Sequence, residues 1–140
     1  MEITRVSVSA GVKALLVASE LPIDDLDDPT IALHGATHGG RLLGVIGLQV
    51  LAGVGLLRSL AVDASARDRG LGGQLCELVL RDARDRGLAE VWLLTTSARD
   101  YFTRRGFHAV GREQTPDVVR ATAQFTSLCP STAVVMRRAL

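Results

Sequence analysis

The residues best suited to chemistry gather in the segment 67–73, which reads Arg-Asp-Arg-Gly-Leu-Gly-Gly. Three glycines within four positions leave backbone N–H groups uncovered by side chains. The segment lies between an apolar run that ends at Val62 and a helical pattern that begins near Gly72. The positive end of that helix would therefore point at the same place. We expect the segment to bind a phosphate group, and the alternative is a tight turn that joins a strand to a helix.

The spacing of these glycines disfavours two common phosphate ligands. A loop for ATP or GTP needs a lysine after its last glycine, but the only lysine, Lys13, lies far away in the chain. A turn for NAD needs a third glycine where Leu75 stands and an acidic residue where Thr95 and Thr96 stand. Two other classes stay open: another kind of nucleotide-binding protein, and an interaction domain that uses an exposed sheet edge.

The elements that must position this segment follow from the pattern of apolar residues. Alternating or continuous apolar runs predict strands, and apolar residues three or four apart predict helices. Residues 34–40 are rich in glycine and are expected to form a loop. The expected strands are 3–8, 30–34, 41–51, 54–62, 91–95, 107–112 and 133–137, and the expected helices are 11–21, 71–86, 98–105 and 115–125. Such an order predicts an α/β fold with a mixed sheet and helices on both faces.

Length and composition bound the function. The 140 residues, 47% of them apolar, suit a single domain spanning 1–140. Sixteen basic and fifteen acidic residues give a net charge of +1, so neither nucleic acid nor a membrane surface is an expected partner. The sixteen uncharged residues 42–57 would span only about 24 Å as a helix, so we expect a strand hairpin there. With two cysteines and no signal-like N-terminus, the expected compartment is the cytoplasm.

Arg67, Gly70 and Gly72 form the pattern Arg/Gln-x-x-Gly-x-Gly after an apolar strand. This pattern resembles the acetyl-CoA-binding motif of the GNAT acetyltransferase superfamily. The resemblance extends from about Val54 to Val110, because residues 98–107 look like the superfamily's next helix and its closing Gly-Phe. The tail 116–136 is similar to a narrower group, the small acetyltransferases encoded with arsenic-resistance genes.

The resemblance implies a GNAT-like α/β fold, with a mixed, mostly antiparallel central sheet of about seven strands and helices on both faces. It also implies acetyl-CoA as cosubstrate, no metal, and transfer of the acetyl group to the amine of a small acceptor. This acceptor would be amino-acid-like or oxyanion-bearing, with a link to arsenic resistance. The implied cofactor-binding residues are Leu60, Ala61, Val62, Arg67, Asp68, Arg69, Gly70, Leu71, Gly72 and Gly73, and the Leu60 amide would polarise the acetyl carbonyl. A homodimer stays open.

Two departures from the superfamily pattern concern proton transfer. The frequent glutamate base is replaced by Leu56, and the frequent tyrosine acid is replaced by Phe102, with Tyr101 one place earlier. Neighbouring helix positions point about 100° apart, so we expect Tyr101→Phe to keep turnover within about tenfold of the parent. A hundredfold loss would instead assign the acid to Tyr101. An acyl-CoA-binding regulatory module without transfer activity is the alternative function.

Arg58 is the candidate for acceptor binding. It interrupts an apolar strand, and strand alternation predicts that it shares a face with Leu56 and Leu60. It either pairs with a carboxylate of the chain or binds an anionic group of the acceptor. The aspartates at 24, 25, 27 and 28 either cap a turn or attract a cationic amine.

Three further residues have weaker chemical interpretations. His34 and His38 are spaced as metal ligands would be on a helix, but the glycines around them favour a polar loop. Cys129 has no neighbouring base in the sequence, so a small buried side chain is the favoured interpretation and a thiol in the acceptor site the alternative.

Overall fold

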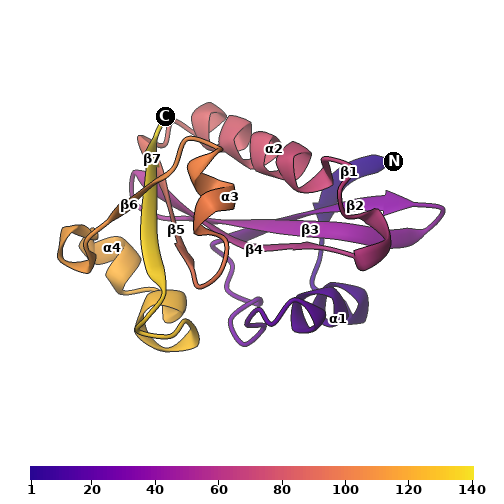
Figure 1. The fold of residues 1–140 in the computed structure, drawn as a ribbon, viewed down its shortest axis with the longest axis horizontal. Helices are drawn as coiled ribbons and strands as arrows, with labels where there is room; N and C mark the ends of the chain where they lie inside the picture. Colours follow the sequence, from indigo (N-terminus) through magenta and orange to yellow (C-terminus); the bar gives the residue numbers. More distant parts are fainter.

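All 140 residues are described by the computed structural model, which contains one seven-stranded sheet (Figure 1). The strands lie in the order β1-β2-β3-β4-β5-β7-β6. Each neighbouring pair is antiparallel except β4 and β5, which confirms the expected mixed, mostly antiparallel sheet. The strands are β1 (Glu2–Val6), β2 (Ile31–His38), β3 (Arg41–Val50), β4 (Val54–Val62), β5 (Glu90–Thr95), β6 (His108–Val110) and β7 (Val134–Ala139).

Helices cover both faces of the sheet, as expected. Figure 1 shows α2 and α3 on one side of the sheet and α1 and α4 on the other. The helices are α1 (Ala10–Ala18), α2 (Leu71–Asp85), α3 (Arg99–Thr103) and α4 (Asp117–Arg120). Two short 3-10 helices, η1 (Ala64–Ala66) and η2 (Arg112–Gln114), and one short π-helix, η3 (Gln124–Leu128), complete the fold. No helix in the molecule is both long and apolar enough to cross a bilayer.

The longest helix, α2, is held by one apolar stripe. Leu75, Val79 and Leu80 on this stripe are almost fully buried against the sheet. Burying each such side chain stabilises the fold by about 2 kcal/mol. The helix ends before Gly87, whose φ of +76° is the left-handed conformation that glycine adopts at low cost. The sequence predicted that the helix ends before this glycine.

Strands β3 and β4 form the hairpin expected from residues 42–57. The N–H of Leu51 donates to the carbonyl of Val54 at 2.9 Å, and Gly53 turns the chain with a φ of +76°. The apolar run is continuous because both strands are covered on both faces.

The expected loop at residues 34–40 is wrong for most of its length, because β2 continues to His38. The turn is made by Gly39 and Gly40 alone, both with positive φ. Gly35 serves packing instead: a Cβ there would lie within 3 Å of side-chain atoms of Val6 and Leu42. Position 35 is therefore a glycine because neighbouring side chains leave no room for a Cβ.

The helix expected over 115–125 is shorter than predicted. It is reduced to α4, and the chain then enters the separate π-helix η3. The Thr122 hydroxyl donates to the carbonyl of Val119 at 2.7 Å and accepts from the N–H of Phe125. Such local side-chain bonds compete with regular helical bonding, which explains the break.

Candidate functional site

The centre of the sheet opens between its only two parallel strands. Strands β4 and β5 pair at residues 54–56 and 90–92 and separate beyond Leu56. Residues 57–60 of β4 and 93–96, at and just beyond the end of β5, then line a cavity of about 450 Å³, which we call the first cavity. Its volume suits a small organic ligand.

A bulge in β4 shapes this cavity. Arg58 lies opposite Gly47 and Ala61 opposite Val45, so two residues of β4 face the single β3 residue between them. Ser59 makes the extra step possible with a φ of +58°, which is uncommon for a serine.

The bulge overturns the expectation that Arg58 and Leu60 share a face. Arg58 reaches Asp25 in the segment after α1, whereas Leu60 packs against the core cluster under α2. The extra residue reverses the alternation of side chains, so Ala61 instead turns to the α1 side. The expectation failed because a regular strand was assumed.

A second cavity, of about 540 Å³, lies over the glycine-rich segment. Gly70 has a φ of +76° and stands before the first residue of α2, so the helix N-terminus opens into this cavity. The Leu71 side chain is buried in the core while its backbone stays at the cavity. The lining brings together most of the expected cofactor residues, namely Leu60, Val62, Arg67, Asp68, Gly70, Leu71, Gly72 and Gly73; Ala61 and Arg69 are not part of it.

Tyr101 and Leu60 line both cavities and mark the junction between them. The Tyr101 hydroxyl lies so close to Gly72 that a Cβ on this glycine would be 2.6 Å from the oxygen. Phe102 is buried, packs edge-on against Phe107 and lines the first cavity only. The 100° offset between neighbouring helix positions therefore places Tyr101, and not Phe102, at the junction of the two cavities.

Tyr101 is a neutral phenol at neutral pH. Burial raises the pKa of its hydroxyl and Cys76 adds to the rise, while the Arg105 guanidinium opposes it. A protonated hydroxyl at the junction can donate a proton or a hydrogen bond.

Arg105 is a site residue that the sequence reasoning missed. Its guanidinium carbon lies 4.3 Å from the centre of the Tyr101 ring, and its side chain lines the second cavity. The sequence did contain a signal for it: Arg105 lies four positions after Tyr101, and residues four apart in a helix share a face.

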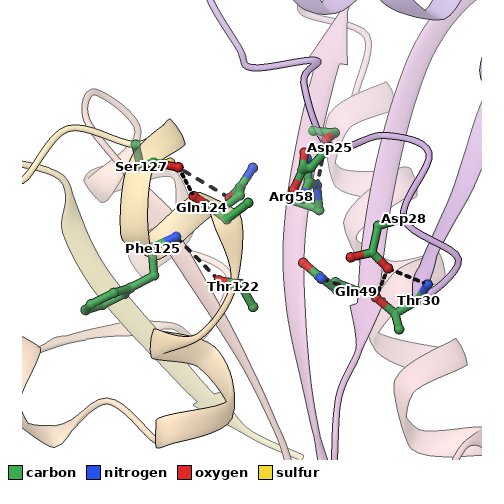
Figure 2. Close-up of polar contacts among 12 residues, drawn as sticks. Asp25, Asp28, Thr30, Gln49, Arg58, Thr122, Gln124, Phe125 and Ser127 are labelled. Carbon is green, nitrogen blue, oxygen red and sulfur yellow. Dashed lines mark hydrogen bonds and ion pairs between the residues drawn. The ribbon is translucent and has the colours of Figure 1, made fainter.

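Arg58 is paired with a carboxylate of the chain, one of the two alternatives left open by the sequence. Its two terminal nitrogens donate to the two carboxylate oxygens of Asp25, with Nη1 to Oδ2 at 2.5 Å, and its Nε donates to Ser59 Oγ at 3.2 Å (Figure 2). The Arg58 side chain is fully buried, yet the residue belongs to the lining of the first cavity. Its guanidinium is thus held at a defined position in the cavity wall.

The neighbouring aspartates differ from Asp25 in their environment. The Asp28 carboxylate accepts from the N–H and the hydroxyl of Thr30, and these bonds lower the pKa of Asp28. Asp24 and Asp27 are exposed. Asp28 therefore caps a turn, as one of the two sequence interpretations held, and Asp25 ties the segment to β4.

The opposite wall of the first cavity comes from the chain after η3. Leu128, Cys129 and Pro130 line it, and Figure 2 shows the Gln124 side chain on the side of the Asp25–Arg58 pair while the Phe125 ring points away. Burial raises the pKa of the Cys129 thiol, so it is protonated at neutral pH. Leu56, at the position of the expected base, is fully buried in a third apolar cluster.

Comparison with known proteins agrees with this geometry. Residues 11–107 match the family model described as Acetyltransferase (GNAT) family. An amino-acid acetyltransferase of Neisseria meningitidis is 31% identical over 85 residues, which is 59% of this chain. The chain spans about a fifth of the length of that relative (20%).

Solved structures share the whole fold. N-acetylglutamate synthase from Neisseria gonorrhoeae, complexed with coenzyme A and N-acetyl-glutamate, matches 100% of this chain and 35% of its own, with a TM-score of 0.79 and 21% identity. A Mycobacterium tuberculosis protein in complex with CoA matches 100% of this chain and 99% of its own, with a TM-score of 0.78 and 23% identity. Together with the family match over most of its length, these likenesses establish that the chain belongs to the acetyltransferase (GNAT) family.

Proposed function

We propose that the chain is an acetyl-CoA-dependent N-acetyltransferase that acts on the amine of a small amino-acid-like acceptor. The observation that carries this proposal is the junction of the two cavities at Leu60 and Tyr101. A long ligand with its phosphates over the glycine-rich segment can deliver an acyl group at the junction. An acceptor in the first cavity then meets this group from the opposite face of the sheet.

The backbone of the second cavity suits the anionic part of acetyl-CoA. The amides of residues 68–73 and the N-terminus of α2 supply donors and a positive dipole for its diphosphate. The strand 60–62 would pair with the pantetheine arm. Within it, the Leu60 amide follows the bulge and would donate to the acetyl carbonyl, where one preorganised donor contributes about 3 kcal/mol.

Acyl transfer needs one proton removed from the amine and one supplied to the departing thiolate. The amine nitrogen forms a bond to the acetyl carbon, the carbon–sulfur bond breaks, and the sulfur takes a proton. Tyr101 is the protonated group at the junction and acts as the acid. No side chain at Leu56 can act as base, so the amine enters in its neutral form and releases its proton to water. An α-amine with a pKa of about 8 is partly neutral at pH 7.

The first cavity suits an acceptor that bears both a carboxylate and an amine. Glu20 and Arg58 are the two charged residues in its lining. The acceptor carboxylate would share the Arg58 guanidinium with Asp25 or take the place of Asp25. The relatives named amino-acid acetyltransferase support this class. An oxyanion-bearing acceptor, including an arsenical, would meet the same guanidinium.

Amine-dependent release of CoA thiol from acetyl-CoA tests the proposal. We expect saturable thiol release with at least one α-amino acid, and slower release with the matching amine that lacks the carboxylate. Tight binding of acetyl-CoA without release of CoA thiol for any amino acid or amine tested would favour the alternative, a regulatory acyl-CoA-binding module. The absence of a base at Leu56 is compatible with that alternative.

A further inference from the structure

The second cavity contains a cation that no group of the chain neutralises. None of the four ion pairs of the molecule includes Arg105. Its Nε is buried and has no hydrogen-bond partner. The Arg105 side chain lines the second cavity, next to the Tyr101 ring.

The position of this guanidinium is fixed from two sides. The ring of Tyr101 lies beneath it at 4.3 Å. On the other side it lies against the start of α2, where a Cβ on Gly73 would be 3.0–3.2 Å from its atoms. A side chain held by stacking loses little further freedom when it binds a ligand.

Electrostatics make this placement unfavourable without an anion. The N-terminus of a helix carries a partial positive charge, and the guanidinium is always protonated. Two positive groups therefore lie side by side over Gly72 and Gly73. An anion between them would relieve the repulsion and would satisfy the buried Nε.

We propose that Arg105 is the side chain that binds the diphosphate of the acyl-CoA cosubstrate, and that it makes the site select CoA thioesters over thioesters lacking the diphosphate. The inference rests on the proposed function. The backbone amides of the glycine-rich segment would bind the diphosphate from one side, and the Arg105 guanidinium would bind it from another side. Tyr101 then has a second role, which is to hold the guanidinium in place.

Calorimetric titration with two probes, CoA and pantetheine, tests the inference. Pantetheine contains the thiol arm and no phosphate. In Arg105→Gln, we expect the Kd for CoA to rise about tenfold or more, because a charge-assisted contact is lost. The Kd for pantetheine should stay within about twofold. Arg105→Lys should keep the salt dependence of CoA binding that Arg105→Gln reduces.

Arg104→Gln is the matched control, because this neighbouring arginine is exposed and lies outside the cavity lining. An unchanged Kd for CoA in Arg105→Gln would overturn the inference. Equal weakening of CoA and pantetheine would also overturn it, since Arg105 would then only support the Tyr101 ring. If the parent chain binds neither CoA nor acetyl-CoA, the proposed function itself fails, a result distinct from the other two.

Discussion

The hydroxyl of Tyr101 is the single polar atom on which proton transfer depends in this account. The sequence led us to expect a small effect of Tyr101→Phe, whereas the position of the ring at the junction of the cavities favours a large one. We now predict that kcat falls about a hundredfold while the Kd for acetyl-CoA stays near the parental value. Steady-state kinetics with a calorimetric Kd check this, and a loss below tenfold would remove the acid role.

Arg58 is the residue that should select the acceptor. We predict that Arg58→Lys raises the acceptor KM about tenfold or more and leaves the Kd for acetyl-CoA unchanged, because an ammonium cannot reproduce bidentate binding. Since the side chain is buried and paired with Asp25, the urea unfolding of the variant must be measured alongside. An unaltered KM, or equal acetylation of anionic and neutral amines by the parent, would take Arg58 out of the acceptor site.

The N-terminal turn of α2 is the element that binds the cofactor in this account. Gly72→Val should abolish acetyl-CoA binding, since a side chain there crowds the phosphates and meets the Tyr101 hydroxyl. The double variant Gly72→Val/Tyr101→Phe separates these two effects: removal of the hydroxyl, with the ring kept under Arg105, should not restore binding. Gly11→Ala in α1, where a Cβ would make only an ordinary contact with Ser9 Oγ at 3.8 Å, is the control. Parental affinity in a folded Gly72→Val protein would refute the loop assignment.

Strand β2 carries a titratable group that couples stability to pH. His34 Nδ1 is buried without a partner, and burial lowers the pKa of His34, with Arg5 and Arg86 adding to the effect and Asp82 opposing it. The unfolded chain therefore takes up the proton first as pH falls. The contribution of His34 to stability is complete above about pH 6.5, the ordinary histidine value, and declines as pH falls toward the lowered value.

We predict that the free energy of unfolding in urea falls between pH 7.5 and pH 5 more steeply in the parent than in His34→Gln. The carboxyls of Asp28, Asp63 and Glu90 also have lowered pKa values and destabilise the fold at lower pH. They are common to both proteins, so the difference between the two curves isolates the histidine. Identical pH dependence in the two proteins would show that His34 does not titrate in this range.

At the scale of the whole molecule, the sequence predicted the order of the elements and the position of the phosphate-binding segment. Both depend on local patterns: apolar spacing defines α2, and glycines 70, 72 and 73 define its N-terminus. The sequence did not predict the bulge at Ser59, because nothing in the residue type demands a positive φ. Nor did it identify Asp25 as the partner of Arg58, since these residues meet only when the sheet has formed.

In the proposed function, one continuous channel from the glycine-rich segment through Leu60 and Tyr101 to Arg58 binds both substrates. Backbone amide shifts measured by NMR during titration with CoA, and then with a saturating amino acid acceptor, test it most directly. We predict that CoA shifts the amide signals of residues 60–62 and 68–73 together with those of Tyr101 and Arg105, and that the acceptor then shifts those of Arg58 and Cys129. CoA-induced shifts that spare the segment 68–73, or acceptor shifts confined to a distant face, would contradict it.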